Sequence, residues 1–182
     1  VARAMFHQRS GIALGPPYTS IIRPRPRHPD EGTVVLATSL TARQAGASTD
    51  WFADLVAGRQ GDETVEGAWG GHFDAGDWDR RIEHLWYTRA AAELVDRRPE
   101  VFASLDLDLP ESGDAVPDVL DEGLWSLDLY RRMQGPDGAI RGGIEASEHP
   151  QRDNTSWTDD LALLAYAPDV WSSYLYAGVA AE

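Results

Sequence analysis

Apolar positions recur at helical spacing in two stretches of the 182-residue chain. In the first stretch, Ile82, Trp86, Ala90 and Leu94 step by four, and a few more apolar residues form an adjoining stripe. This spacing predicts a helix with one broad buried face. Pro99 lies just past the stretch, where a helix is expected to stop.

The second stretch, residues 117–134, predicts another long helix. Pro117 is tolerated in its first turn, and the acidic residues that follow it are favoured there by the helix dipole. The apolar residues cover more than one stripe, which indicates packing on two sides. Trp86 in the first helix and Trp125 in this one both lie on apolar faces, so we expect both in the core.

The other elements are shorter, and the fold class that the pattern indicates is mainly α with long loops and little strand. No alternation of strands with helices suggests a parallel sheet. Gly142–Ser156 is polar and is expected to form a long loop. The expected short elements are a helix within 1–10, a strand over 33–38, helical turns within 51–57 and 159–167, and a last helix capped by Ser172.

Alternating prolines in Arg23-Pro24-Arg25-Pro26-Arg27 block regular helix, so this stretch should run extended over the surface. Its three arginines stand in an acidic chain of formal net charge −14, which favours pairing with an acidic face. The same charge would repel phosphate, so neither nucleic acid nor an anionic membrane is an expected partner. No apolar run approaches the roughly 18 residues of a membrane span.

The chain has no cysteine, which excludes disulfides, thiolate catalysis and cysteine-ligated metals. It has seven tryptophans, more than a core of this size requires. The surplus suggests flat apolar surfaces that face a ligand, and sugar rings are one candidate.

The stretch 70–79 places Asp74, Asp77 and Asp79 on a glycine-rich backbone just before the first long helix. It does not match an EF-hand calcium loop, and three carboxylates would repel a phosphate. With these sites excluded, the remaining chemistry is a pair of carboxylates that hold a water and remove its proton. Neighbouring negative charges raise the pKa of one carboxylate and make that group a better base. Helix capping by Asp77 or Asp79 is the alternative from the residues alone.

Four segments, in this order, resemble glycoside hydrolase family 9, a cellulase family with an inverting mechanism, and together they span nearly all of the chain. The second resembles the family's Asp-Ala-Gly-Asp signature, and the third its Pro-x-x-Leu-Asp-Glu helix. The segments are FHQRSGIAL (6–14), GGHFDAGDWDR (70–80), PDVLDEGLWSLDLYRRMQGPDGAI (117–140) and WSSYLYAGVAAE (171–182).

The resemblance implies an (α/α)6 barrel and a hydrolase of β-1,4-glucan or a related polysaccharide. By position, Asp77 would be the general base and Asp74 would bind and orient the attacking water. His72 would contact sugar, and His149 and Trp157 resemble a family loop that lines glucose subsites. Asp79 lies outside the pair and is expected to be a helix cap or a surface acid. Trp78 could contact sugar, but a place in the core is at least as well supported.

Two departures from the family limit the prediction. Arg27-His28 stands where many members have a zinc-binding Cys-His pair, so we predict no metal and no cofactor. The family's general acid is a glutamate far toward the C-terminus, and nothing here resembles its surroundings. We therefore interpret residues 1–182 as the N-terminal portion, about half, of one catalytic domain, and expect little activity from them alone. The resemblance also implies an extracellular or periplasmic location.

Two other hypotheses remain open. The chain could be a non-catalytic carbohydrate-binding or interaction domain derived from the same fold. A third hypothesis is an acidic structural domain that depends on calcium. For the hydrolase and for the carbohydrate-binding domain, the expected partner is a polysaccharide or oligosaccharide. The sequence does not fix the oligomeric state.

Overall fold

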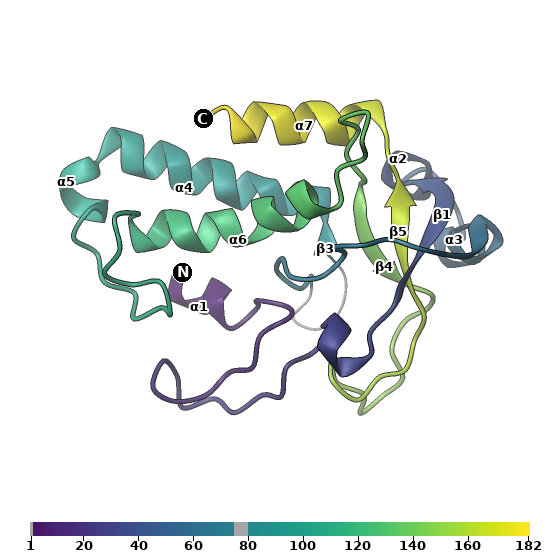
Figure 1. Ribbon diagram of the computed structural model, residues 1–182, viewed down its shortest axis with the longest axis horizontal. Coiled ribbons are helices and arrows are strands. Elements are labelled where there is room, and N and C mark those ends of the chain that lie inside the picture. Colours follow the sequence, from purple (N-terminus) through teal and green to yellow (C-terminus); the bar gives the residue numbers. More distant parts are fainter. Residues whose placement is uncertain (1, 75–79) are drawn as a thin grey trace.

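The computed structural model describes residues 2–74 and 80–182 of the chain (Figure 1). The predictions for Asp77, Trp78 and Asp79 lie outside the described residues. Three long helices occupy one side of the molecule and a sheet occupies the other (Figure 1). The long helices are α4 (Leu85–Arg97), α6 (Asp118–Arg132) and α7 (Val170–Ala180).

The shorter helices lie at the ends and edges of these two layers. The run predicted within 1–10 is helical only over its first half, and the turn predicted within 51–57 is confirmed as α3. The shorter helices are α1 (Ala2–Phe6), α2 (Ala42–Ala45), α3 (Trp51–Ala57), α5 (Pro99–Phe102) and two 3-10 turns, Pro29–Glu31 and Ile82–His84.

Both long helices predicted from the apolar spacing, α4 and α6, are confirmed. They cross closely at Gly123, where an added Cβ would lie 3.2 Å from the Cβ of Ala91 and 3.2 Å from the Cα of Thr88. The residue without a side chain thus sets how near the two helix axes come. Thr88 also donates a hydrogen bond of 2.7 Å to the Gly123 carbonyl across this contact.

The close crossing explains why the predicted buried stripe of α4 is wrong in detail. The buried positions are Leu85, Thr88 and Ala91, which step by three and face α6. Of the row predicted to be core, Ile82 is buried just before α4, as expected. The other three residues turn outward: Ala90 is exposed, Trp86 is 51% exposed and Leu94 is 43% exposed. Trp125, the other tryptophan predicted to be core, is half-buried.

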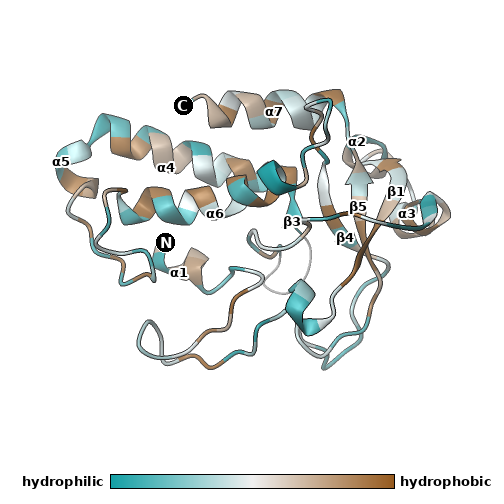
Figure 2. Ribbon diagram, in the orientation of Figure 1, coloured by the Kyte–Doolittle hydropathy of each residue, from teal (hydrophilic) through white to brown (hydrophobic). Residues whose placement is uncertain are grey.

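The sheet is mixed, with the strand order β2-β1-β5-β4-β3. Among the described strands, β1 and β5 alone are parallel, and the other neighbours pair antiparallel. The apolar residues of β1 and β5 are visible as brown bands in Figure 2. The strands are β1 (Val35–Thr41), β2 (Arg59–Thr64), β3 (Arg80–Arg81), β4 (Gly143–Ala146) and β5 (Leu163–Ala167).

This sheet corrects the expectation of little strand. The short strand over 33–38 is found as β1, but β4 lies in the predicted loop 142–156 and β5 in the predicted helical turn 159–167. Every residue of β4 is buried, and so are four of the five in β5. Strands buried on both faces show no polar alternation, so a short apolar run does not reveal its type.

Two further local expectations change. The cap of α7 is Asp169, whose side chain accepts from the Ser172 backbone N–H at 2.8 Å, and Ser172 lies within the helix. The arginine–proline stretch is partly interior, because Arg23 and Arg27 are each only 7% exposed. The predicted pairing with acidic residues holds for Arg25, which pairs with Asp30 and Glu31 at the surface, and for Arg27, which pairs with Asp159.

No helix in the described part of the chain is long and apolar enough to cross a membrane. Across residues 2–74 and 80–182, no three His, Cys, Asp or Glu side chains gather in a way that could hold a metal ion.

Candidate active site

The backbone of residues 70–74, which we call the motif segment, lies directly on α6. Gly70 and Gly71 have φ values of 88° and 71°, in the left-handed region that favours glycine. A Cβ on Gly70 would lie 2.7 Å from a guanidinium nitrogen of Arg132, and one on Gly71 would lie 2.7 Å from Cδ2 of Leu129. Both glycines are therefore required for the segment to approach the helix this closely.

Hydrogen bonds hold the motif segment from two sides. The Gly71 carbonyl accepts from Nε1–H of Trp125 on α6 at 3.0 Å and from the Ser10 backbone N–H at 2.7 Å. Two residues further on, the Phe73 N–H donates to the Gln8 carbonyl at 2.8 Å. The segment thus pairs with residues 8–10 on one side and with α6 on the other.

The imidazole of His72 is buried, at 1% exposure, and both of its nitrogens are engaged. Nε2 lies 2.5 Å from Oε1 of Glu122, and Nδ1 lies 2.8 Å from Oγ of Ser126. An ionised carboxylate only accepts hydrogen bonds, so Nε2–H donates to Glu122. The predicted sugar contact by His72 stays a prediction, while the structure gives its ring an interior position.

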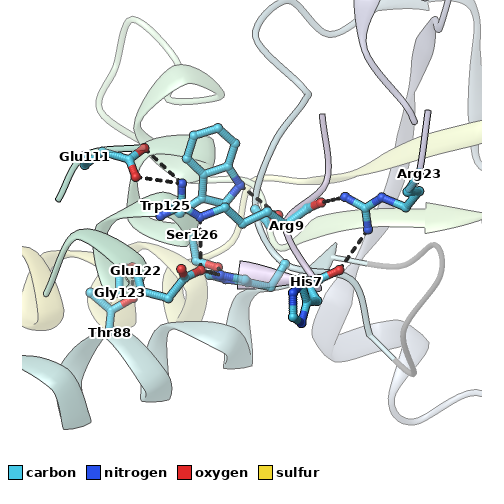
Figure 3. A network of polar contacts seen from close by, with 11 residues as sticks. His7, Arg9, Arg23, Thr88, Glu111, Glu122, Gly123, Trp125 and Ser126 are labelled. Carbon is cyan, nitrogen blue, oxygen red and sulfur yellow. Dashed lines mark hydrogen bonds and ion pairs between the residues drawn. The ribbon is translucent and has the colours of Figure 1, made fainter. Parts of the chain in front are cut away.

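Arg9 completes this buried cluster (Figure 3). Its Nε donates to Oε1 of Glu122 at 3.1 Å, and its Nη1 donates to both carboxylate oxygens of Glu111 at 2.9 and 3.1 Å. The guanidinium also lies 4.7 Å from the ring centroid of Trp125, which adds a cation–π contact. Arg9 is 1% exposed and Glu122 is fully buried, so each charge depends on the other for compensation.

A second buried arginine ties down the segment that carries Arg9. Arg23 donates to the carbonyls of His7, Arg9 and Ile12, and Figure 3 shows the first two of these contacts. Burial lowers the pKa of Arg23 to about 10, which leaves its guanidinium charged at neutral pH. Residues 7–12 are thus held in the shape that meets the motif segment.

A cavity of about 240 Å³ lies between the motif segment and the start of α4. Burial lowers the pKa of His84, and the negative charge of Asp74 opposes this shift in part. Burial raises the pKa of Tyr87 to about 12, with a contribution from the Glu122 charge. Two of the polar groups that line the cavity, His84 and Tyr87, therefore have pKa values shifted toward their neutral forms. The lining residues are Met5, His72, Phe73, Glu83, His84 and Tyr87.

The first turn of α6 places further acids near this cluster. Burial, followed by the charges of Asp114, Glu111 and Asp118, raises the pKa of Asp121 to about 6. Asp121 thus titrates well above the ordinary range of an aspartate, one residue before Glu122.

The other predicted site residues lie elsewhere. Asp74 is exposed at the end of the described segment. His149 and Trp157 belong to the loop between β4 and β5, residues 147–162. The His149 ring packs 4.7 Å from Phe52 of α3, and Trp157 is 42% exposed. His72 is therefore held by α6, whereas His149 contacts α3.

Sequence reasoning did not single out Arg9 or Glu122, the two charges on which the cluster depends. Their signal was present, because both lie inside segments that carry the family resemblance, QRSG and LDEG. Glu122 also lies on the same helical face as Ser126, four residues on, and both are buried. An acid on a buried stripe indicates a charged partner.

No family model matches the chain. Both the curated proteins and the solved structures that are similar to it include endoglucanases. Endoglucanase D of Acetivibrio thermocellus is 26% identical over 145 residues, covering 70% of this chain and 23% of that protein. Endoglucanase C of Cellulomonas fimi is 33% identical over 112 residues, covering 57% of this chain and 10% of that protein. The chain thus spans less than a quarter of the length of these curated relatives.

The solved structures include a metagenome-derived glycoside hydrolase family 9 endoglucanase, with a TM-score of 0.74 and 26% identity. The alignment covers 98% of this chain and 29% of that one. The described helices and sheet therefore align with part of a family 9 (α/α)6 domain.

Proposed function

Because the chain belongs to glycoside hydrolase family 9, we propose that it carries the water-activating side of an inverting hydrolase of β-1,4-glucans. Asp77 takes the proton of the attacking water, and Asp74 orients that water. The general acid, a glutamate in the family, is supplied from outside residues 1–182. The observation that carries the proposal is the rigid attachment of the motif segment to α6 and residues 8–10, which fixes the backbone that leads into Asp74.

An inverting mechanism suits this arrangement physically. The base must hold a water on one face of the sugar while an acid protonates the leaving oxygen on the other face. Neighbouring carboxylates raise the pKa of one partner and so improve it as a base. A neutral polysaccharide also fits a chain of net charge −14 better than an anionic substrate would.

The proposed substrate class is supported by the relatives, several of which are endoglucanases. We propose that His149 and the partly exposed Trp157 contact the glucan from the β4–β5 loop. A polymeric substrate of this kind is degraded outside the cytoplasm, so we also propose an extracellular or periplasmic location.

The test uses the full-length protein and a soluble cellulose derivative, with release of reducing ends as the measurement. Asp77→Asn and Asp74→Asn should each lower turnover by about 10²-fold or more, the usual contribution of a general base, without lowering the melting temperature. Asp79→Asn is the matched control, because it removes a carboxylate of the same segment that lies outside the proposed pair. Normal turnover in Asp77→Asn would refute the proposal.

The same preparations distinguish the binding-domain hypothesis. Cello-oligosaccharides are titrated while tryptophan fluorescence is recorded. Binding without turnover in the unmodified full-length protein would favour a non-catalytic carbohydrate-binding domain. The isolated 182-residue chain should show little or no turnover, and a clear rate would mean that an acid within residues 1–182 protonates the leaving group.

A further inference from the structure

The His72 side chain connects the motif segment to α6 two residues before Asp74. We infer that His72, clamped between Glu122 and Ser126, is a positioning residue that fixes the backbone from which Asp74 projects. The inference rests on the proposed function, since it concerns how the proposed water-orienting carboxylate is held. It gives the imidazole a mechanical task in place of the predicted sugar contact.

The clamp acts at both ends of the ring. Glu122 and Ser126 are four residues apart on α6, so they lie one above the other on one face of the helix. One contacts Nε2 at 2.5 Å and the other contacts Nδ1 at 2.8 Å. Rotation of the ring would break both contacts at once, so its plane is fixed relative to the helix axis.

The carboxylate that holds the ring is itself immobilised. Oε1 of Glu122 accepts from Arg9 at 3.1 Å as well as from His72, and Arg9 is in turn held by both carboxylate oxygens of Glu111. Because Arg9 and Glu122 are each buried, movement of the carboxylate would leave a buried charge without its partner. The charged network therefore resists displacement of His72.

Backbone and side chains connect the same two segments. Arg9 and His72 form an antiparallel bridge, and the Phe73 N–H donates to the Gln8 carbonyl at 2.8 Å. Phe73 is buried, with the guanidinium groups of Arg23 and Arg80 at 5.7 and 5.6 Å from its ring. The chain thus reaches Asp74 from a backbone that is fixed at residues 71, 72 and 73.

This arrangement argues against a direct sugar contact by His72. The side chain is 1% exposed, and both nitrogens already have partners. A sugar hydroxyl would have to displace Glu122 or Ser126 to reach the ring. Misplacement of a reacting group by about 1 Å costs about 10²-fold in rate, so a residue that only positions has a large kinetic effect.

The experiment compares three variants of the full-length protein by steady-state hydrolysis of a cello-oligosaccharide. His72→Ala removes both ring contacts. His72→Gln keeps a donor that reaches Glu122. Thr38→Val is the matched control, because the buried Thr38 hydroxyl also bonds two groups, the Leu55 carbonyl and the Leu40 N–H, at β1.

We expect His72→Ala to lower kcat by about 10²-fold with KM within about twofold of the unmodified protein, and His72→Gln to recover at least half of that loss on a logarithmic scale. Thr38→Val should lose a similar amount of melting temperature and keep its kcat. If His72→Ala is too unstable to purify, the kcat of His72→Gln relative to Thr38→Val at equal melting temperature decides the question.

Three results would overturn the inference. A raised KM with unchanged kcat would mean that His72 contacts substrate. Equal kcat losses in His72→Ala and Thr38→Val would mean a general effect of stability, and unchanged kinetics in His72→Ala would mean no role. An inactive unmodified protein, or an active Asp77→Asn, would refute the proposed function itself, whereas the three results above leave it standing.

Discussion

The motif segment (residues 70–74) and the β4–β5 loop (residues 147–162) are both held by a buried ion pair, yet they use it differently. In the motif segment, the predicted site residue His72 is itself part of the anchor through Glu122. In the loop, the anchor is the pair between Asp159 and Arg27, and the predicted sugar ligands His149 and Trp157 are not members of that pair. The first design fixes one geometry, as a reacting group requires, and the second leaves exposed side chains to adapt to a ligand.

The largest effect should come from breaking the anchor of the motif segment. Glu122→Ala leaves Arg9 buried without its fully buried partner, which should lower the free energy of unfolding by about 3–5 kcal/mol. Glu111→Ala is the control, because the Glu111 side chain is 33% exposed, and it should cost under about 1 kcal/mol. Denaturant unfolding of the full-length protein measures both, and equal losses would contradict a special role for Glu122.

The close approach of the motif segment to α6 should be the next most sensitive feature. Gly71→Ala adds a Cβ at 2.7 Å from Leu129 Cδ2 and strains a φ of 71°, so we expect a loss of about 3 kcal/mol. Gly61→Ala isolates the backbone term, because its φ is 59° and no atom lies within 4 Å of the added Cβ. It should cost about 1–2 kcal/mol in the same unfolding assay. If Gly61→Ala lost more stability than Gly71→Ala, the contact of Gly71 with α6 would not be tight.

A smaller effect is expected in the β4–β5 loop. Asp159→Asn removes the charge that faces Arg27 but keeps an oxygen that accepts from the Leu161 N–H, a bond of 2.8 Å. We expect a loss of about 1–2 kcal/mol of stability, and weaker oligosaccharide binding with kcat retained. A kcat loss equal to that of His72→Ala would mean that the two regions are not held independently.

The smallest effect concerns the charge beside the first anchor. The pKa of Asp121 is about 6 in the fold against an ordinary 3.8, so between these values the folded state binds more protons than the unfolded state. Stability from this group is therefore lost as pH rises through that window. Asp121→Asn should raise the stability at pH 7 by less than about 1 kcal/mol, because the group is partly exposed, and should flatten its decline between about pH 4 and 6. Melting curves across this range measure the change, and a destabilised variant at pH 7 would contradict it.

The sequence predicted the parts of the fold that depend on local periodicity. The helices α4 and α6 follow from apolar spacing and from Pro99 and Pro117 at their borders. The sheet was missed because β4 and β5 are short and buried, so neither alternation nor length distinguishes them.

The candidate site was predictable only where its residues are adjacent in the chain. His72 and Asp74 stand in one motif, but the pairing of Arg9 with Glu122 joins residues that no local pattern connects. The exposure of Trp86 was missed for a related reason, because a partner helix decides which apolar stripe of α4 is covered. Long-range partners therefore decided both the anchor of the motif segment and the buried face of α4.

The parallel pairing of β1 with β5 has a consequence for synthesis on the ribosome. Val35 pairs with Leu163, so the centre of the sheet forms only after almost all of this sequence has emerged. The contact of α4 with α6 joins residues much closer along the chain and is available earlier. Local contacts form faster than distant ones. We therefore expect β1 to remain unpaired with β5 in the nascent chain, with its apolar Val35 and Leu36 uncovered. A chaperone that binds apolar strands would engage β1 during this period.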